Sequence, residues 1–151
     1  MSEIPNTAFT PTRPSWDATA MELAKIFAAR STDAKIKVGA VILSERSKTV
    51  VGAGLNGRYP GSPDEGRRSL ETGGSEFIHA EQAAIVRARW ESGEDHVLVT
   101  TVEPCHECAL LILAARHIKR VVYLTPYAGD GKRRRGSEIL EEAGLEVIQW
   151  L

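Results

Sequence analysis

Cysteine is scarce in this sequence, and its two cysteines are only three residues apart. Cys105 and Cys108 lie in the stretch EPCHEC, and the other 149 of the 151 residues include none. A disulfide between such close neighbours would close a very short loop and add little stability. In a reducing compartment, a lone pair of cysteines more often binds a metal or takes part in catalysis. The scarcity therefore argues against a disulfide-rich domain and leaves a redox pair or a metal site.

Long apolar runs and an excess of one charge are also missing. No run approaches the roughly 18 apolar residues of a membrane span, and the first residues lack the pattern of a signal peptide. We therefore expect a cytoplasmic protein with no membrane association. The 19 basic and 20 acidic residues give a net charge of −1. This balance argues against a protein that grips long nucleic acid, whose affinity comes mostly from clustered Lys and Arg, but it permits a small anionic substrate.

The remaining composition predicts one domain with a short lead-in. Hydrophobic residues make up 42% of the chain, enough for a core. Three prolines in residues 1–14 indicate an extended lead-in, so the domain is predicted to occupy residues 15–151. SWDATAMELAKIFAARS predicts a helix with Ser15 as its N-cap. KVGAVIL and TVVGAGL predict an antiparallel hairpin. Residues 56–75 hold five glycines and two prolines, which indicates a functional loop with substrate contacts.

From residue 77 onward, helical and strand patterns alternate. We expect a helix from about Phe77 to Trp90, a strand HVLVTTV, a helix through CALLILAAR and a strand RVVYLT. A helix SEILEEAG capped by Ser137 and a last strand LEVIQW complete the chain. Such alternation implies parallel strands with helices on both faces. With the hairpin added, the predicted fold is a three-layer α/β/α sandwich with a mixed, mostly parallel five-stranded sheet.

The two cysteines are well placed to bind zinc. Pro104 suits the first position of a helix, so Cys105 and Cys108 are expected in its first turn, on one face. The positive end of the helix dipole lowers a thiol pKa and so favours the thiolate that a metal requires. Zinc prefers sulfur and imidazole, and a catalytic zinc site uses three protein ligands and keeps one position open.

The third ligand has to come from one of four histidines. His79 begins a helix and is followed two residues later by Glu81, which at that spacing does not share the ligand geometry. Glu81 is better suited to carry a proton beside the open position. Taken singly the signals are weak: an isolated CxxC is as often redox-active or incidental, and a lone HxE is usually a helix start.

Taken together, the motifs resemble a known family. The order H-x-E followed by P-C-x-x-C is the signature of zinc deaminases. With RPSWD, VGAVIL, GLNG, HAEQAAI and IKRVVYL, the chain from about Arg13 onward resembles the deoxycytidylate (dCMP) deaminase family of the cytidine deaminase-like superfamily. The resemblance implies zinc-dependent hydrolytic deamination of a cytosine nucleotide, most simply dCMP to dUMP and ammonia, by a protein that forms homo-oligomers.

The resemblance also implies roles for individual residues. Zinc would be held by His79, Cys105 and Cys108, and Glu81 would take the proton of the attacking water and pass protons to N3 and to the leaving ammonia. The other implied substrate contacts are the backbone N–H of Ala80 to the base carbonyl, the carbonyl before Pro104 to the amino group, and Asn56 to the sugar. For Asn56 the alternative is a left-handed turn residue before Gly57.

One position departs from the family pattern, and no cysteine is left for a second zinc. The chain has Ala83 in HAEQAAI, where dCMP deaminases usually carry asparagine. This departure leaves the exact nucleotide open. The alternative substrates for the same deamination are another free cytosine nucleotide or nucleoside and a base in RNA or DNA. A non-catalytic zinc protein is a further alternative, although a closed structural site needs four protein ligands.

A nucleotide phosphate needs cationic donors, and two clusters offer them. Arg58, Arg67 and Arg68 lie in the glycine-rich loop, and KRRR spans residues 132–135. Either cluster can fork a phosphate, and the alternative is that both are solvated loop charges. Tyr127, in the loop before KRRR, either packs on the substrate or covers the edge of the sheet.

Overall fold

The structure is a computed structural model that describes residues 12–63, 76–127, 129 and 131–151. Most of the predicted lead-in, as well as Arg67 and Arg68, lies outside these residues. The first described helix is α2 (Trp16–Ala29), and Ser15 caps it as predicted, accepting a hydrogen bond from the N–H of Ala18 at 3.0 Å. One face of α2 is buried through Ala20, Met21 and Ala24.

Five strands form one mixed sheet. They are β1 (Gly39–Ser44), β2 (Val50–Leu55), β3 (His96–Val102), β4 (Ile118–Thr125) and β5 (Glu146–Gln149). Their order is β2-β1-β3-β4-β5. β1 pairs antiparallel with both β2 and β3, whereas the β3–β4 and β4–β5 pairs are parallel. Four strands therefore run in one direction and β1 alone runs against them, which confirms the predicted mixed, mostly parallel sheet.

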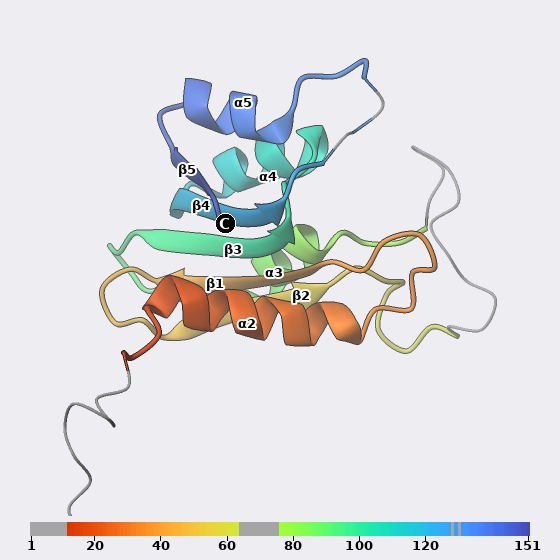
Figure 1. Cartoon of the computed structure of the whole chain (residues 1–151), viewed down its shortest axis with the longest axis horizontal. Helices are drawn as coiled ribbons and strands as arrows, with labels where there is room; N and C mark the ends of the chain where they lie inside the picture. Colours follow the sequence, from red (N-terminus) through yellow and green to blue (C-terminus); the bar gives the residue numbers. More distant parts are fainter. Residues whose placement is uncertain (1–11, 64–75, 128, 130) are drawn as a thin grey trace, which may run out of the picture.

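Helices cover both faces of the sheet, which confirms the three-layer sandwich (Figure 1). On one face, α2 packs against alternate residues of the central strands, among them Val41, Val97 and Val99. On the other face, Ile42 and Leu98 pack against α3 (Ala80–Arg87), α4 (His106–Ala115) and α5 (Gly136–Glu142). Every residue of β1 and β3 is buried, as expected for strands with helices on both sides.

The predicted boundaries of α3 and α5 were wrong. The helix expected from Phe77 to Trp90 spans only Ala80–Arg87, because Ala88 turns to an extended conformation and the N–H of Arg89 donates to the carbonyl of Val51 on β2 at 2.9 Å. The last helix is not capped by Ser137. It begins at Gly136 with Arg135 in the cap position, and the N–H of Ser137 donates to a carboxylate from outside the helix.

The fold brings the start of α3 and the start of α4 to the same end of the sheet. α3 lies against β2 without an intervening side chain, since a Cβ added to Gly54 would come within 2.6 Å of the Ala80 carbonyl oxygen. α4 follows the end of β3 after a short connection that contains Glu103, Pro104 and Cys105. In the described part of the chain, no helix has the length and apolarity that crossing a membrane requires.

Candidate metal centre and substrate cavity

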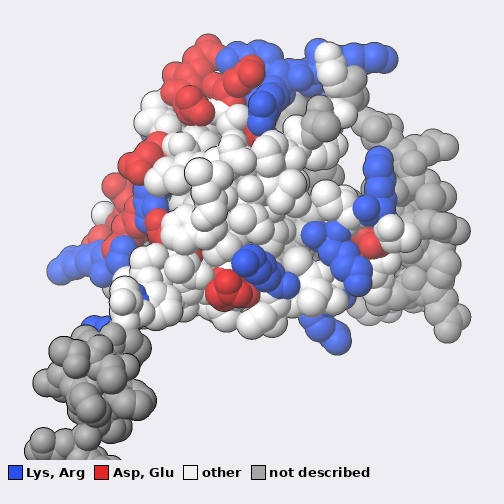
Figure 2. Space-filling model, viewed as in Figure 1, with Lys and Arg blue, Asp and Glu red and all other residues white. Residues whose placement is uncertain are grey.

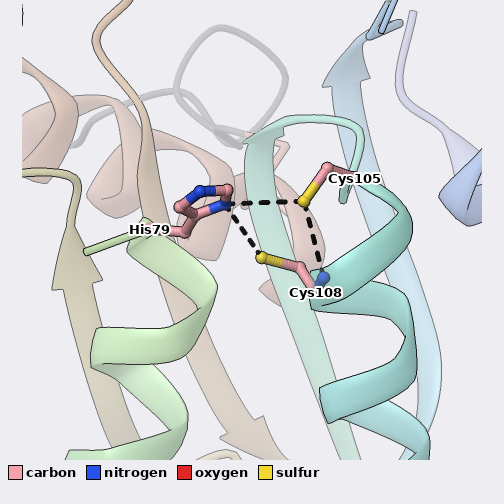
Figure 3. A group of neighbouring side chains, drawn as sticks. All are labelled: His79, Cys105 and Cys108. Atoms are coloured by element: carbon pink, nitrogen blue, oxygen red, sulfur yellow. Dashed lines mark hydrogen bonds between the residues drawn. The ribbon is translucent and has the colours of Figure 1, made fainter. Parts of the chain in front are cut away.

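Cys105 and Cys108 lie at the start of α4, side by side (Figure 3). Cys105 is the N-cap, and its sulfur accepts a hydrogen bond from the N–H of Cys108 at 3.5 Å. Pro104 therefore precedes the cap and is not the first helical residue as we expected. Both cysteines are free thiols, so the disulfide is not formed and both sulfurs are available to a metal.

His79 is the histidine that meets the two sulfurs. It is the N-cap of α3. Its backbone N–H donates a hydrogen bond to the side-chain oxygen of Gln82 at 2.8 Å, which fixes the start of that helix. Its Nδ1 lies 3.5 Å from the Cys105 Sγ and 3.2 Å from the Cys108 Sγ (Figure 3). The three candidate ligand atoms all lie within 4.8 Å of one another.

This geometry fits zinc. With Zn–S of about 2.3 Å and Zn–N of about 2.0 Å at tetrahedral angles, nitrogen and sulfur ligands are about 3.6 Å apart. The two observed nitrogen–sulfur distances are close to this value. Among the residues that the structure describes, this is the one group of three histidine, cysteine or acidic side chains placed to share an ion. A tetrahedral ion held by three such ligands keeps its fourth position open.

The two thiols differ in protonation. The hydrogen bonds that Cys105 receives from Cys108 and makes with His79 lower its pKa to about 4, although burial opposes the shift. Cys108 has a raised pKa, because it donates to Cys105, is buried and faces Glu81. The hydrogen bond with Cys105 raises the pKa of His79. The hydrogen bonds around Cys105 therefore favour the thiolate that a metal requires.

Glu81 reaches the same centre from the first turn of α3. Its carboxylate is almost fully buried and accepts from the Thr100 hydroxyl and from the Cys108 thiol, each at 3.3 Å. Burial raises its pKa. Glu81 does not belong to the three-atom ligand group. The carboxylate thus lies beside the ligands without joining them, as its spacing from His79 predicted.

A cavity of about 160 Å³ opens beside these residues. Its walls come from five parts of the chain: the α2–β1 loop, the end of β2, the start of α3, the segment after β3 and the segment after β4. Among the lining residues are Asp33, Lys35, Asn56, Ala80, Glu81, Glu103, Tyr127 and Arg133. Ala80 is the first residue of α3, so its N–H has no acceptor within the helix and is available to a ligand.

Asn56 holds the cavity wall together. Its Oδ1 accepts from the N–H of Val38 at 2.8 Å, and its Nδ2 donates to the Ile36 carbonyl at 2.8 Å and to Asp33 at 3.2 Å. Among the described non-glycine residues only Lys48 and Arg116 have a positive φ, so the left-handed turn was the wrong alternative. The side chain fixes the α2–β1 loop, for which no motif predicted a place at the site.

Arg58 does not line this cavity. Its guanidinium bonds to Glu76 at 3.3 Å and lies over the Tyr59 ring. It lines a different cavity of about 180 Å³, formed with Arg30, Thr32 and residues 59–62. The structure thus does not bring Arg58 together with the metal-ligand group.

The arginines of the KRRR run bind different acidic side chains. Arg133 lines the cavity and pairs with Glu107 at 2.8 Å. Arg134 pairs with Glu142, and Arg135 bonds to Glu103. Figure 2 shows basic and acidic side chains next to one another at the edge of the molecule where α5 lies in Figure 1. Only Arg133 of this run lines the cavity.

Ala83, the departure from the family pattern, does not line the cavity. A Cβ added to Gly54 would come within 2.8 Å of the Ala83 Cβ, so this alanine packs on the backbone of β2. No sequence motif pointed to a role for the side chain of Glu103, although it stands two residues before Cys105. Nor did the sequence mark Lys35, which belongs to no motif or periodic pattern.

Fold and centre together define the class of the protein: an α/β sandwich with a zinc site open to a cavity. Comparison with known proteins agrees. Residues 14–125 match the family model of the cytidine and deoxycytidylate deaminase zinc-binding region. The chain is 33% identical to the deoxycytidylate deaminase of Schizosaccharomyces pombe and 32% identical to that of Saccharomyces cerevisiae, over 92% and 91% of its length. It covers 45% and 46% of those proteins, so it spans about half the length of these relatives.

Solved structures give the same result. The dCMP deaminase of the cyanophage S-TIM5, in complex with dCMP and dUMP, superposes with a TM-score of 0.74 at 27% identity, over 92% of this chain and 99% of that one. This chain belongs to the cytidine and deoxycytidylate deaminase zinc-binding family. Its cofactor is zinc, and His79, Cys105 and Cys108 are placed as possible ligands.

Proposed function

We propose that the protein is a zinc-dependent deaminase that converts dCMP and water to dUMP and ammonia. The observation that carries the proposal is the buried Glu81 carboxylate, which touches the ligand group and lines the cavity without being a ligand. A purely structural zinc site would need a fourth protein ligand and no such acid. The complex of the cyanophage relative with dCMP and dUMP supports this choice of nucleotide.

His79, Cys105 and Cys108 would hold the zinc, which when bound lowers the pKa of water toward neutrality. Glu81 accepts the proton as the water oxygen adds to C4 of the pyrimidine, and it delivers that proton to N3. When the C4–N4 bond then breaks, Glu81 carries the second water proton to the amino group, which leaves as ammonia. Its raised pKa suits this task, because a group that gives and takes protons works best with a pKa near the operating pH.

Other residues of the cavity would orient the nucleotide. The N–H of Ala80 is proposed to donate to the base carbonyl, and Tyr127 to pack on the substrate. Asn56 would act at the sugar, chiefly by fixing the loop that carries Lys35. For the phosphate, we propose Lys35 and Arg133 in place of Arg58, because both line the cavity and Arg58 does not.

A substrate panel tests this proposal. The zinc-loaded protein is assayed for loss of the cytosine absorbance and release of ammonia with dCMP, deoxycytidine, dCTP, CMP, a 5-substituted dCMP and single-stranded DNA. We expect dCMP to give the highest kcat/KM. Equal turnover of deoxycytidine and dCMP would contradict a site that reads phosphate, and a preference for single-stranded DNA would show a deaminase of nucleic acid.

The phosphate assignment has a matched control in the same loop. Lys35→Gln is expected to lower kcat/KM for dCMP by about 10- to 100-fold, the cost of losing a hydrogen bond to a charged group, with deoxycytidine unaffected. Lys37→Gln removes a charge that does not line the cavity and should leave both rates unchanged. An equal loss with Lys37→Gln would show a general field effect.

We also propose that the protein forms homo-oligomers and acts in the cytoplasm on free nucleotides, with no nucleic-acid partner. Val86 on α3 is 81% exposed and Leu110 on α4 is 50% exposed, which supports a contact between copies on this side of the sheet. On the face in Figure 2, the described residues carry charges of both signs and form no continuous cationic track. Light scattering coupled to size-exclusion chromatography measures the oligomeric state directly.

A further inference from the structure

Glu103 is a buried carboxylate to which the proposed reaction gives no task. It directly follows β3 and stands two residues before Cys105, and it is only 2% exposed. A carboxylate this deeply buried needs hydrogen-bond partners, because an unpaired buried charge is strongly destabilising. Its partners therefore show what the residue holds in place.

Among the described residues, the donors to this carboxylate are Tyr127 and Arg135, between β4 and α5, and Ser137 in the first turn of α5. One carboxylate oxygen accepts from the Tyr127 N–H at 3.1 Å and from Arg135 Nη2 at 2.5 Å. The other accepts from Arg135 Nε and from the Ser137 N–H, each at 3.3 Å. These bonds outweigh burial and lower the pKa of Glu103. The carboxylate thus accepts hydrogen bonds from both ends of the segment 127–137, at residue 127 and at residues 135–137.

A second, steric observation places the same segment against the same connection. A Cβ added to Gly136 would lie 1.9 Å from the Pro104 carbonyl oxygen and 2.9 Å from that of Cys105. The backbone at Gly136 therefore packs directly on the backbone of Pro104 and Cys105. No residue other than glycine fits at position 136 unless one of these segments moves. The start of α5 is docked directly on the chain that leads into the first cysteine ligand.

The segment 127–137 forms one wall of the cavity. Tyr127 and Arg133 lie within it, and both line the cavity. We propose that Glu103 is a positioning residue that fixes this wall relative to the zinc ligands and so sets the affinity for the nucleotide. This inference rests on the proposed function. Both oxygens of Glu103 are occupied by donors from the protein, so the residue acts through the wall and takes no part in proton transfer.

Glu103→Gln tests the inference, and Glu45→Gln is its matched control. Glutamine keeps the size of the side chain but presents an NH₂ group to donors that require an acceptor. Glu45 likewise bonds to an arginine, Arg120, at 2.8 Å, but it follows β1 at the opposite end of the sheet. In zinc-loaded protein, Glu103→Gln is expected to raise KM for dCMP about tenfold, with kcat within about twofold and one zinc per chain. Glu45→Gln should leave KM unchanged.

Hydrogen exchange gives a readout that needs no activity. In Glu103→Gln the amides of Tyr127 and Ser137 should exchange faster, and in Glu45→Gln they should not. If the wild-type protein deaminates no cytosine nucleotide, the proposed function fails, while the exchange result still decides whether Glu103 anchors the wall. Unchanged exchange at both amides, or an unchanged KM in an active protein, would overturn the inference.

Arg135→Gln keeps the test decisive if Glu103→Gln does not fold. Arg135 is half exposed and does not line the cavity, so its loss should be tolerated. We expect a smaller rise in KM in the same direction. Where Glu103→Gln does fold, the double variant should have the same KM as Glu103→Gln alone. A fall in kcat without a change in KM, or a KM equal to that of the wild type, contradicts a role through the wall.

Discussion

Replacing Glu81 by glutamine separates proton transfer from metal binding. The substitution keeps the volume of the side chain, and the amide oxygen can still accept from the Thr100 hydroxyl. Glutamine cannot carry a proton, so the general acid–base contribution, typically 10²- to 10⁴-fold, is lost. This corresponds to about 3–5 kcal/mol in the activation barrier. Because Glu81 is outside the three-atom ligand group, zinc content should remain at one per chain.

The assay is single-turnover conversion of dCMP, followed by absorbance and product analysis, with zinc measured on the same samples. Glu22→Gln is the control, since Glu22 is exposed on α2 and pairs with Lys25 in the same helix. It should react at the wild-type rate. A Glu81→Gln protein that keeps zinc and turns over within about fivefold of wild type would refute the role given to the carboxylate. Loss of zinc in this variant would instead make Glu81 a ligand.

Three further predictions concern the metal, the packing and the response to pH. Cys105→Ala should abolish stoichiometric zinc binding, measured by mass spectrometry, whereas retained zinc would exclude this ligand set. Gly39→Ala should lower the free energy of unfolding by about 1–3 kcal/mol or more in urea titrations, because its Cβ would lie 1.9 Å from a carbonyl oxygen of α2. The hydrogen bond from Arg120, opposed by burial, lowers the pKa of Glu45 below its ordinary 4.5. Its stabilisation is therefore present above pH 4.5 and lost as the pH falls through the lower, folded-state pKa. The urea midpoints of wild type and Glu45→Gln should converge at low pH, and a constant gap would contradict the ion pair.

Local signals predicted the fold well. The hydroxyl of Ser15 starts α2 where expected, and the strand HVLVTTV has its predicted bounds. The motif that joins His79 to the two cysteines predicted a centre that the fold does assemble. These features depend on periodicity, capping and ligand spacing, which a short stretch of sequence carries by itself.

The features that the sequence did not predict depend on contacts between distant segments. α3 ends early because Arg89 bonds to β2, and Ser137 is not a cap because Glu103 takes its N–H. Arg58 looked as suitable as Arg133 for a phosphate, since charge alone does not say which cavity a loop faces. Lys35 carried no signal at all, because contacts with a distant segment, among them those of the Asn56 side chain, place its loop at the site.

The most direct test of the central claim is product formation by protein with one zinc per chain. Incubation with dCMP should yield dUMP and ammonia in equal amounts, and removal of zinc by a chelator should stop the reaction until zinc is restored. If the zinc-loaded protein releases no ammonia from dCMP or from any other cytosine nucleotide, nucleoside or single-stranded nucleic acid, the assignment as a deaminase is contradicted.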